Sequence, residues 1–155
     1  MRQARIGPVR MVAQRDVTRQ ALGRLTIETP GPGMTDFTQA AAGFVAESGI
    51  SDGLLTVFCR HTSASLIIQE NADPDVRADI LMMLDRLAPR NVPYRHGQEG
   101  PDDMPAHVRS LLTGVSLSVP VLEGALTLGT WQGIYLIEHR DAPHRREIIL
   151  HVTGT

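Results

Sequence analysis

The segment LLTVFCR at residues 54–60 decides the fold of this 155-residue chain. Its side chains are apolar on both faces of a strand, which is typical of a strand in the middle of a sheet that is covered on both sides. A second strand-like segment, ASLIIQ at residues 64–69, begins after only three intervening residues. So short a connection predicts a hairpin between the two segments.

Further strand patterns lie on both sides of this pair, and helical patterns separate them. We expect strands at residues 9–17, 24–29, 115–121, 125–128, 133–139 and 147–153. We expect helices at 36–48, from Asp73 to the proline at 89, and at 104–113. This order predicts a single domain over residues 1–155 with an α+β fold, in which mainly antiparallel sheets form a sandwich-like arrangement and the helices pack on one side.

Local signals mark several helix ends and faces. Gly49 is expected to end the first helix, and Asp73 with Pro74 to begin the second. The third helix is expected to turn its apolar side chains inward; these are Met104, Val108, Leu111 and Leu112. His107 then lies about a quarter turn from that face, where one ring nitrogen can be oriented by the protein while the other faces a cleft.

Composition excludes several classes of protein. The formal charge of −2 and the few aromatic residues are unlike a nucleic-acid-binding domain, so no nucleic acid partner is expected. No apolar stretch reaches the roughly 20 residues of a membrane span, so no membrane partner is expected. Cys59 is the only cysteine, which fits a reducing compartment, and its apolar surroundings indicate a buried structural thiol. The chain also starts without an apolar leader, and we expect a cytoplasmic protein.

Three histidines are the first candidates for chemistry: His61 at a strand end, His96 in a polar loop, and His107. Histidine is the commonest protein ligand of zinc-like metals, and a catalytic metal has three protein ligands and one open position. Their spacing matches no recognised metal motif, so they are candidates either for a divalent metal site, with zinc or magnesium, or for acid/base groups. His139 and His144 flank a charged turn and are expected to be solvated.

Glu138 lies on the same face of its predicted strand as Ile134 and Leu136. A carboxylate on an apolar face has to be paired, to coordinate a cation or to shift its pKa. Glu138 is therefore a candidate site carboxylate, and the alternative is a strand-end residue already in water.

Phosphate-holding groups occur in two segments. Arg146 belongs to a cluster of arginines between the last two strands, and Ser63 and Ser65 follow His61. Arginine forks suit phosphate, and hydroxyls can complete a cradle if the two segments are adjacent. Trp131, between glycines, is a candidate for a cleft wall or a subunit contact, and simple core packing is the alternative.

Several motifs together resemble the YjbQ family, whose members are described as secondary thiamine-phosphate synthases. The motifs are HTSAS (61–65), ENADP (70–74), HGQEG (96–100), MPAH (104–107), GVS (114–116) and GTWQG (129–133). The resemblance implies a homotrimer with a polar pocket that holds the matching histidines. It also implies an activity that joins a phosphorylated thiazole to an activated pyrimidine and releases pyrophosphate. Where many members carry a Gly-Pro-Arg turn, this chain has DAPHRR at residues 141–146.

The sequence thus favours an enzyme that acts on phosphorylated small molecules. His61, His107 and Glu138 are its candidate catalytic residues, and His61, His96 and His107 its candidate metal ligands. Ser63, Ser65, Arg146 and Trp131 are the candidate substrate-binding residues. The alternatives are a trimeric module that binds a metal or a phosphometabolite without robust catalysis, and a metal-dependent hydrolase.

Overall fold

The computed structural model describes residue 4 and residues 6–155, and within them eight strands and three helices. The order is β1 (Arg19–Thr29), β2 (Gly33–Asp36), α1 (Thr38–Ser48), β3 (Gly53–Cys59), β4 (Ala64–Glu70), α2 (Pro74–Leu87), α3 (Asp103–Thr113), β5 (Ser116–Leu122), β6 (Ala125–Leu126), β7 (Gln132–Glu138) and β8 (His144–Gly154). None of the helices described is long and apolar enough to cross a membrane.

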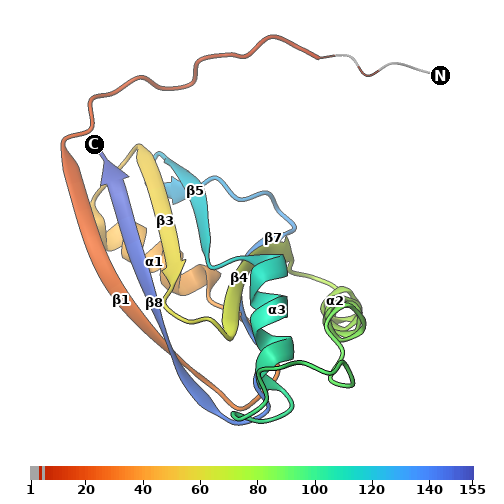
Figure 1. The fold of residues 1–155 in the computed structure, drawn as a ribbon. Helices are drawn as coiled ribbons and strands as arrows, with labels where there is room; N and C mark the ends of the chain where they lie inside the picture. Colours follow the sequence, from red (N-terminus) through yellow and green to blue (C-terminus); the bar gives the residue numbers. More distant parts are fainter. Residues whose placement is uncertain (1–3, 5) are drawn as a thin grey trace.

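The strands form two antiparallel sheets. The larger sheet has the strand order β1-β8-β3-β5-β6, and the smaller sheet has the order β2-β7-β4. In Figure 1 the larger sheet stands in front, with α1 behind it, α3 lies beside β4, and α2 lies on the far side of α3. The predicted α+β class, with antiparallel sheets and helices on one side, is confirmed.

The predicted hairpin between the segments at 54–60 and 64–69 is wrong, because the two strands belong to different sheets. Phe58 on β3 pairs with Ile149 on β8, whereas Ala64 on β4 pairs with Glu138 on β7. The chain passes from one sheet to the other between residues 60 and 63. Strands that switch sheets form the corners of packed sheets, and a short connection is compatible with either geometry.

The strand predicted at residues 9–17 does not form, and its apolar side chains are exposed. The reason is the lack of a pairing partner. β1 begins at Arg19, which pairs with Gly154 at the end of β8, and none of the strands described pairs with residues 9–17. A strand without a partner leaves its backbone groups to water, so this segment runs as an irregular arm.

The core lies between the two sheets and α1. Ala41 and Val45 of α1 are fully buried there, and Gly49 ends the helix in a left-handed conformation with φ of 66°. Asp73 caps α2 by accepting a hydrogen bond from the backbone N–H of Asp75 at 2.9 Å, as predicted. Cys59 is also buried, and this burial raises the pKa of its thiol, in agreement with a structural role.

The face that α3 buries differs from the predicted one. Ala106, Arg109 and Ser110 are buried, whereas Leu111 is 83% exposed and Leu112 is 54% exposed. Ser110 donates a hydrogen bond to the carbonyl of Ala64, and this bond fixes the rotation of the helix against β4. The buried face of α3 therefore mixes small apolar and polar side chains, whereas Leu111 and Leu112 at its C-terminal end face open surface.

Candidate functional site

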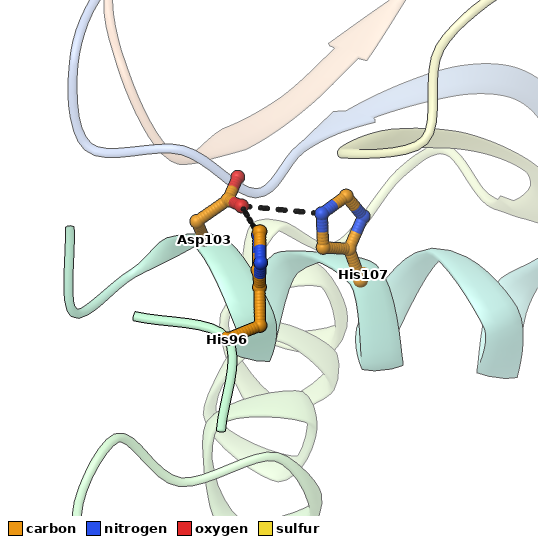
Figure 2. A group of neighbouring side chains, drawn as sticks. All are labelled: His96, Asp103 and His107. Carbon is orange, nitrogen blue, oxygen red and sulfur yellow. Dashed lines mark hydrogen bonds and ion pairs between the residues drawn. The ribbon is translucent and has the colours of Figure 1, made fainter. Parts of the chain in front are cut away.

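His96, Asp103 and His107 form a cluster at the start of α3. Figure 2 shows both rings turned toward the Asp103 carboxylate. One ligand atom from each residue lies within 4.8 Å of the other two. Asp103 and His107 are four residues apart on one helix and share a face, while His96 arrives from the loop that joins α2 to α3. The sequence predicted the convergence of the two histidines but missed Asp103.

The hydrogen bonds of His107 define its free nitrogen. Its Nδ1 lies 2.9 Å from the carbonyl oxygen of Thr62, which can only accept, so Nδ1 carries a proton. Nε2 then faces Oδ2 of Asp103 at 3.2 Å. Nε2 of His96 lies 2.7 Å from the same oxygen and donates a hydrogen bond to it. One carboxylate oxygen is therefore shared by two imidazole rings.

The Asp103 carboxylate is held from its other side. Arg140 donates to Oδ1 of Asp103 through NH1, to Oδ2 of Asp102 through Nε at 2.8 Å, and to the carbonyl of Glu99 through NH2 at 2.9 Å. Asp103 is 1% exposed. Burial alone raises the pKa of its carboxyl, but the hydrogen bond from His96 and the charge of Arg140 outweigh burial, so the pKa lies below its ordinary value.

The chemistry of this donor set fits a zinc-like cation. Two imidazole nitrogens and one carboxylate oxygen are the ligands that zinc takes in catalytic sites, with a further position left for water or substrate. Magnesium prefers oxygen ligands and fits this set less well. The bond from His107 to a backbone carbonyl and the bond from Arg140 to Asp103 are outer contacts of the kind that orient metal ligands.

His61 lies outside this cluster, although the sequence grouped it with the other two histidines. Its Nε2 accepts a hydrogen bond from the backbone N–H of Glu147 at 2.8 Å, so this nitrogen is already engaged. Burial, and after it the charge of Arg146, lowers the pKa of His61. The structure therefore brings His96 and His107 together with Asp103, and places His61 against β8.

A cleft of about 630 Å³ connects His61 with His107. Its lining residues are Phe58, Cys59, Arg60, His61, Thr62, His107, Ser110, Leu111, Gly114 and Val115. The volume is in the range of small-molecule sites, and a mainly apolar wall with a few polar groups is typical of them. The cleft gives a ligand access to the ring of His107.

Glu138 and Arg146 meet each other instead of the cluster. Nε of Arg146 donates to Oε2 of Glu138 at 2.7 Å, and NH2 donates to Oε1 at 2.5 Å and to Oγ of Ser63 at 3.1 Å. Burial raises the pKa of Glu138, but the hydrogen bonds from Arg146, the backbone of Arg140 and Thr29 lower it by more than burial raises it. The pKa therefore lies below its ordinary value, and the carboxylate stays charged. The segments of Arg146 and Ser63 are thus adjacent, yet the guanidinium is 3% exposed and engaged within the protein.

Ser65, His139 and Trp131 do not line the cleft. Ser65 is fully buried, with Oγ 2.7 Å from Nε2 of His139. The expectation that His139 is solvated is wrong: its side chain is 1% exposed, and burial lowers its pKa to about 4. Trp131 is 64% exposed beside β7, so simple core packing is excluded for it.

Comparison with known proteins identifies relatives over most of the chain. The sequence model of the family described as "UPF0047 protein YjbQ-like" matches residues 23–155. A UPF0047 protein of Synechocystis is 50% identical over 145 residues, which cover 93% of this chain and 99% of that protein. The UPF0047 protein YugU of Bacillus subtilis is 40% identical over 121 residues, covering 78% of this chain and 89% of that protein.

Solved structures share the fold. The crystal structure of an uncharacterized conserved protein of the YjbQ/UPF0047 family from Clostridium acetobutylicum is 41% identical, with a TM-score of 0.78, and covers 83% of this chain and 98% of that chain. A hypothetical protein from Aeropyrum pernix is 30% identical, with a TM-score of 0.80, and covers 87% and 99% of the two chains. The names of these relatives state no activity.

Proposed function

The chain belongs to the YjbQ-like UPF0047 family, and from that premise we propose that it is a metal-dependent enzyme acting on phosphorylated small molecules. His96, Asp103 and His107 hold the divalent cation, and the adjacent cleft holds the substrate. In its specific form, the proposal is the reaction that the motif resemblance implies: a phosphorylated thiazole is joined to an activated pyrimidine, and pyrophosphate is released. The ring nitrogen of the thiazole forms a bond to the carbon of the pyrimidine that carries the diphosphate, the carbon–oxygen bond to that diphosphate breaks, and pyrophosphate leaves with the bonding electrons, so no oxidant or reductant is needed.

One observation carries the proposal: three metal-ligating side chains converge within 4.8 Å, and one of them opens on a cleft. A bound zinc-like cation would supply positive charge to the oxygens of the departing pyrophosphate. The chain's own residues prepare the site. Thr62 fixes the ring of His107, and Arg140 fixes the carboxylate of Asp103. The apolar part of the cleft wall offers contact area to the organic part of a substrate.

A metal-dependent hydrolase is the second candidate function. The donor set itself favours it, because two histidines and one carboxylate with an open position are the ligands of several zinc hydrolases. Both candidates need the cation. The synthase forms a carbon–nitrogen bond and releases pyrophosphate, whereas the hydrolase transfers a phosphoryl group to water and releases an alcohol. Binding of a metal or a phosphometabolite without turnover is the third outcome of the same experiment.

The proposal includes a homotrimer in the cytoplasm. Leu111 and Leu112 on α3, with Phe58 on the larger sheet at 45% exposure, place large apolar side chains on open surface near the cleft. Exposed apolar patches of this kind mark sites of association. A cytoplasmic setting suits a chain whose only cysteine, Cys59, is a buried free thiol.

The experiment compares wild-type protein with His107→Ala in two assays. The first follows thiamine phosphate formation from the two precursors, and the second follows release of phosphate from phosphate esters, each with zinc, with a chelator and after zinc is restored. We expect activity that the chelator removes and zinc restores, and its loss in His107→Ala. His151→Ala is the matched control, because His151 lies on β8, outside the cluster and the cleft, and its ring is hydrogen-bonded to Gln20. Activity that survives both the chelator and His107→Ala would rule the proposal out.

A further inference from the structure

A second hollow, of about 400 Å³, lies on the outer face of the larger sheet. Its lining residues are Thr26, Arg60, His61, Arg145 and Glu147. Thr26 is on β1, Arg145 and Glu147 are on β8, and Arg60 and His61 directly follow β3. Thr26 pairs with Glu147, and the backbone N–H of Arg60 donates to the carbonyl of Glu147 at 3.3 Å. The sheet register therefore brings these side chains together.

Positive charge is in excess at this hollow. Glu147 is the only carboxylate in its lining, and it is shared by Arg60 and by Arg24, whose NH1 lies 3.3 Å from it. Among the described residues, no carboxylate lies within ion-pair distance of Arg145, although Glu28 is opposite it in the sheet. Even with Glu28 counted, there are three guanidinium groups for two carboxylates. The guanidinium groups are those of Arg24, Arg60 and Arg145, and the carboxylates are those of Glu28 and Glu147.

His61 adds a hydrogen-bond donor with a fixed orientation. Its Nε2 accepts from the backbone N–H of Glu147, so the proton of the neutral ring must be on Nδ1. Within the part of the chain that the structure describes, nothing accepts a hydrogen bond from this Nδ1–H. Two arginine forks, this N–H and the hydroxyl of Thr26 are all able to donate. That set suits a tetrahedral oxyanion with several acceptor oxygens.

We propose that the hollow formed by Thr26, Arg60, His61 and Arg145 binds the phosphate group of a phosphorylated small molecule. It is adjacent to the cleft that reaches His107, because Arg60 and His61 line both. The cleft supplies an apolar wall from Phe58 and Leu111 for the organic part of the same molecule. The substrate class is then a phosphate monoester with a flat apolar group, an assignment that rests on the proposed function.

The arginine that binds phosphate is then Arg145 and not Arg146, which the sequence indicated. Successive residues of a strand point to opposite faces of the sheet. Arg146 points inward, is 3% exposed and is committed to Glu138, whereas Arg145 points outward and is exposed. Only the outward arginine can exchange water for a ligand without breaking a buried ion pair.

The test is calorimetric titration of chelator-treated protein with inorganic phosphate and with phenyl phosphate, at low ionic strength. Saturable binding of both is expected, with phenyl phosphate tighter because its ring enters the cleft. Equal affinity for the two would confine the site to free phosphate and overturn the assignment of the substrate class. Because metal-free protein is used, failure of the metal-dependent activity does not affect this measurement, and failure of phosphate binding does not affect the metal assay.

Charge variants make the test specific. Arg60→Gln and Arg145→Gln should each weaken phosphate binding by about tenfold or more, since hydrogen bonds to charged groups are among the stronger ones. Glu147→Gln removes the carboxylate but keeps the backbone N–H to His61, so it should tighten binding several-fold. Arg95→Gln, an exposed arginine in the α2–α3 loop, is the matched control and should bind as wild type. Unchanged affinity in both arginine variants, or no saturable binding by wild type at millimolar phosphate, would overturn the proposal.

Discussion

Glu138 and Arg146 form a two-pronged ion pair inside the protein, with only 2% and 3% of the residues exposed. The pair joins β7 to β8, and Arg146 extends it to the β3–β4 connection through the carbonyl and the hydroxyl of Ser63. It thereby fixes the point where the chain passes between the two sheets. That point also carries Thr62, whose carbonyl orients His107. The pair supports the site from a distance and is not part of it.

The first prediction concerns the stability of this pair. Arg146→Met should lower the free energy of unfolding by about 3–5 kcal/mol, because it leaves the carboxylate of Glu138 buried without a counter-charge. The double variant Glu138→Gln/Arg146→Met should recover much of that loss, since glutamine still accepts the hydrogen bond from Thr29. Urea denaturation of the wild type and the variants measures both effects.

Arg60→Met is the matched control for the buried pair, because Arg60 pairs with Glu147 at the surface, where its side chain is 51% exposed. Exposed pairs contribute roughly 0–1 kcal/mol. Equal losses in Arg60→Met and Arg146→Met would contradict a special contribution from the buried pair.

A second prediction separates the ligand Asp103 from the residue that positions it. Asp103→Asn should weaken zinc binding more than Arg140→Gln, for which the roughly 10–100-fold loss typical of outer contacts is expected. Arg140→Lys should fall between wild type and Arg140→Gln, because lysine keeps the charge but not the fork. Competition with a chromophoric chelator measures the affinities. Wild-type zinc affinity in Asp103→Asn would remove the carboxylate from the ligand set.

Much of the local structure could be predicted because its causes are local. Gly49 ends α1, and Asp73 caps α2, as the sequence indicates. The hairpin prediction failed because a strand's partner depends on distant segments. Residues 54–60 and 64–69 are adjacent in sequence, but β8 and β7 pair with them from the far end of the chain.

The candidate site could be predicted only in part for the same reason. Asp103 lies one residue before the helix expected at 104–113, whereas α3 begins at Asp103 and so places this carboxylate one turn before His107. The path of the loop that carries His96 toward them has no local signature. The sequence left open whether the segments of Arg146 and Ser63 are adjacent. They are adjacent in the structure, yet the guanidinium of Arg146 is engaged by Glu138, and Nε2 of His61 is engaged by the backbone of Glu147.

The third prediction concerns assembly. Leu112→Glu should convert the proposed trimer to monomers, because it places a charge on the outward apolar face of α3. Ala46→Glu, at an exposed position of α1, is the control and should leave the mass unchanged. Light scattering coupled to size-exclusion chromatography gives the mass. A wild-type protein that runs as a monomer would contradict the proposed assembly.

The last prediction concerns acid stability and His139. Burial lowers the pKa of His139 from 6.5 to about 4, so between these values the unfolded chain binds a proton that the folded chain does not. Stability should therefore be complete above pH 6.5 and fall by up to about 3 kcal/mol as the pH drops toward 4. His139→Gln, which can still accept from Ser65, should flatten this slope, whereas His144→Gln should not. Urea midpoints between pH 4.5 and 6.5 give the slope of stability against pH. Burial also lowers the pKa of His61, so the comparison of wild type with His139→Gln is needed to separate the contribution of His139 from that of His61. If His139→Gln loses stability between pH 6.5 and 4.5 as steeply as the wild type, the loss comes from other titrating groups and the prediction is wrong.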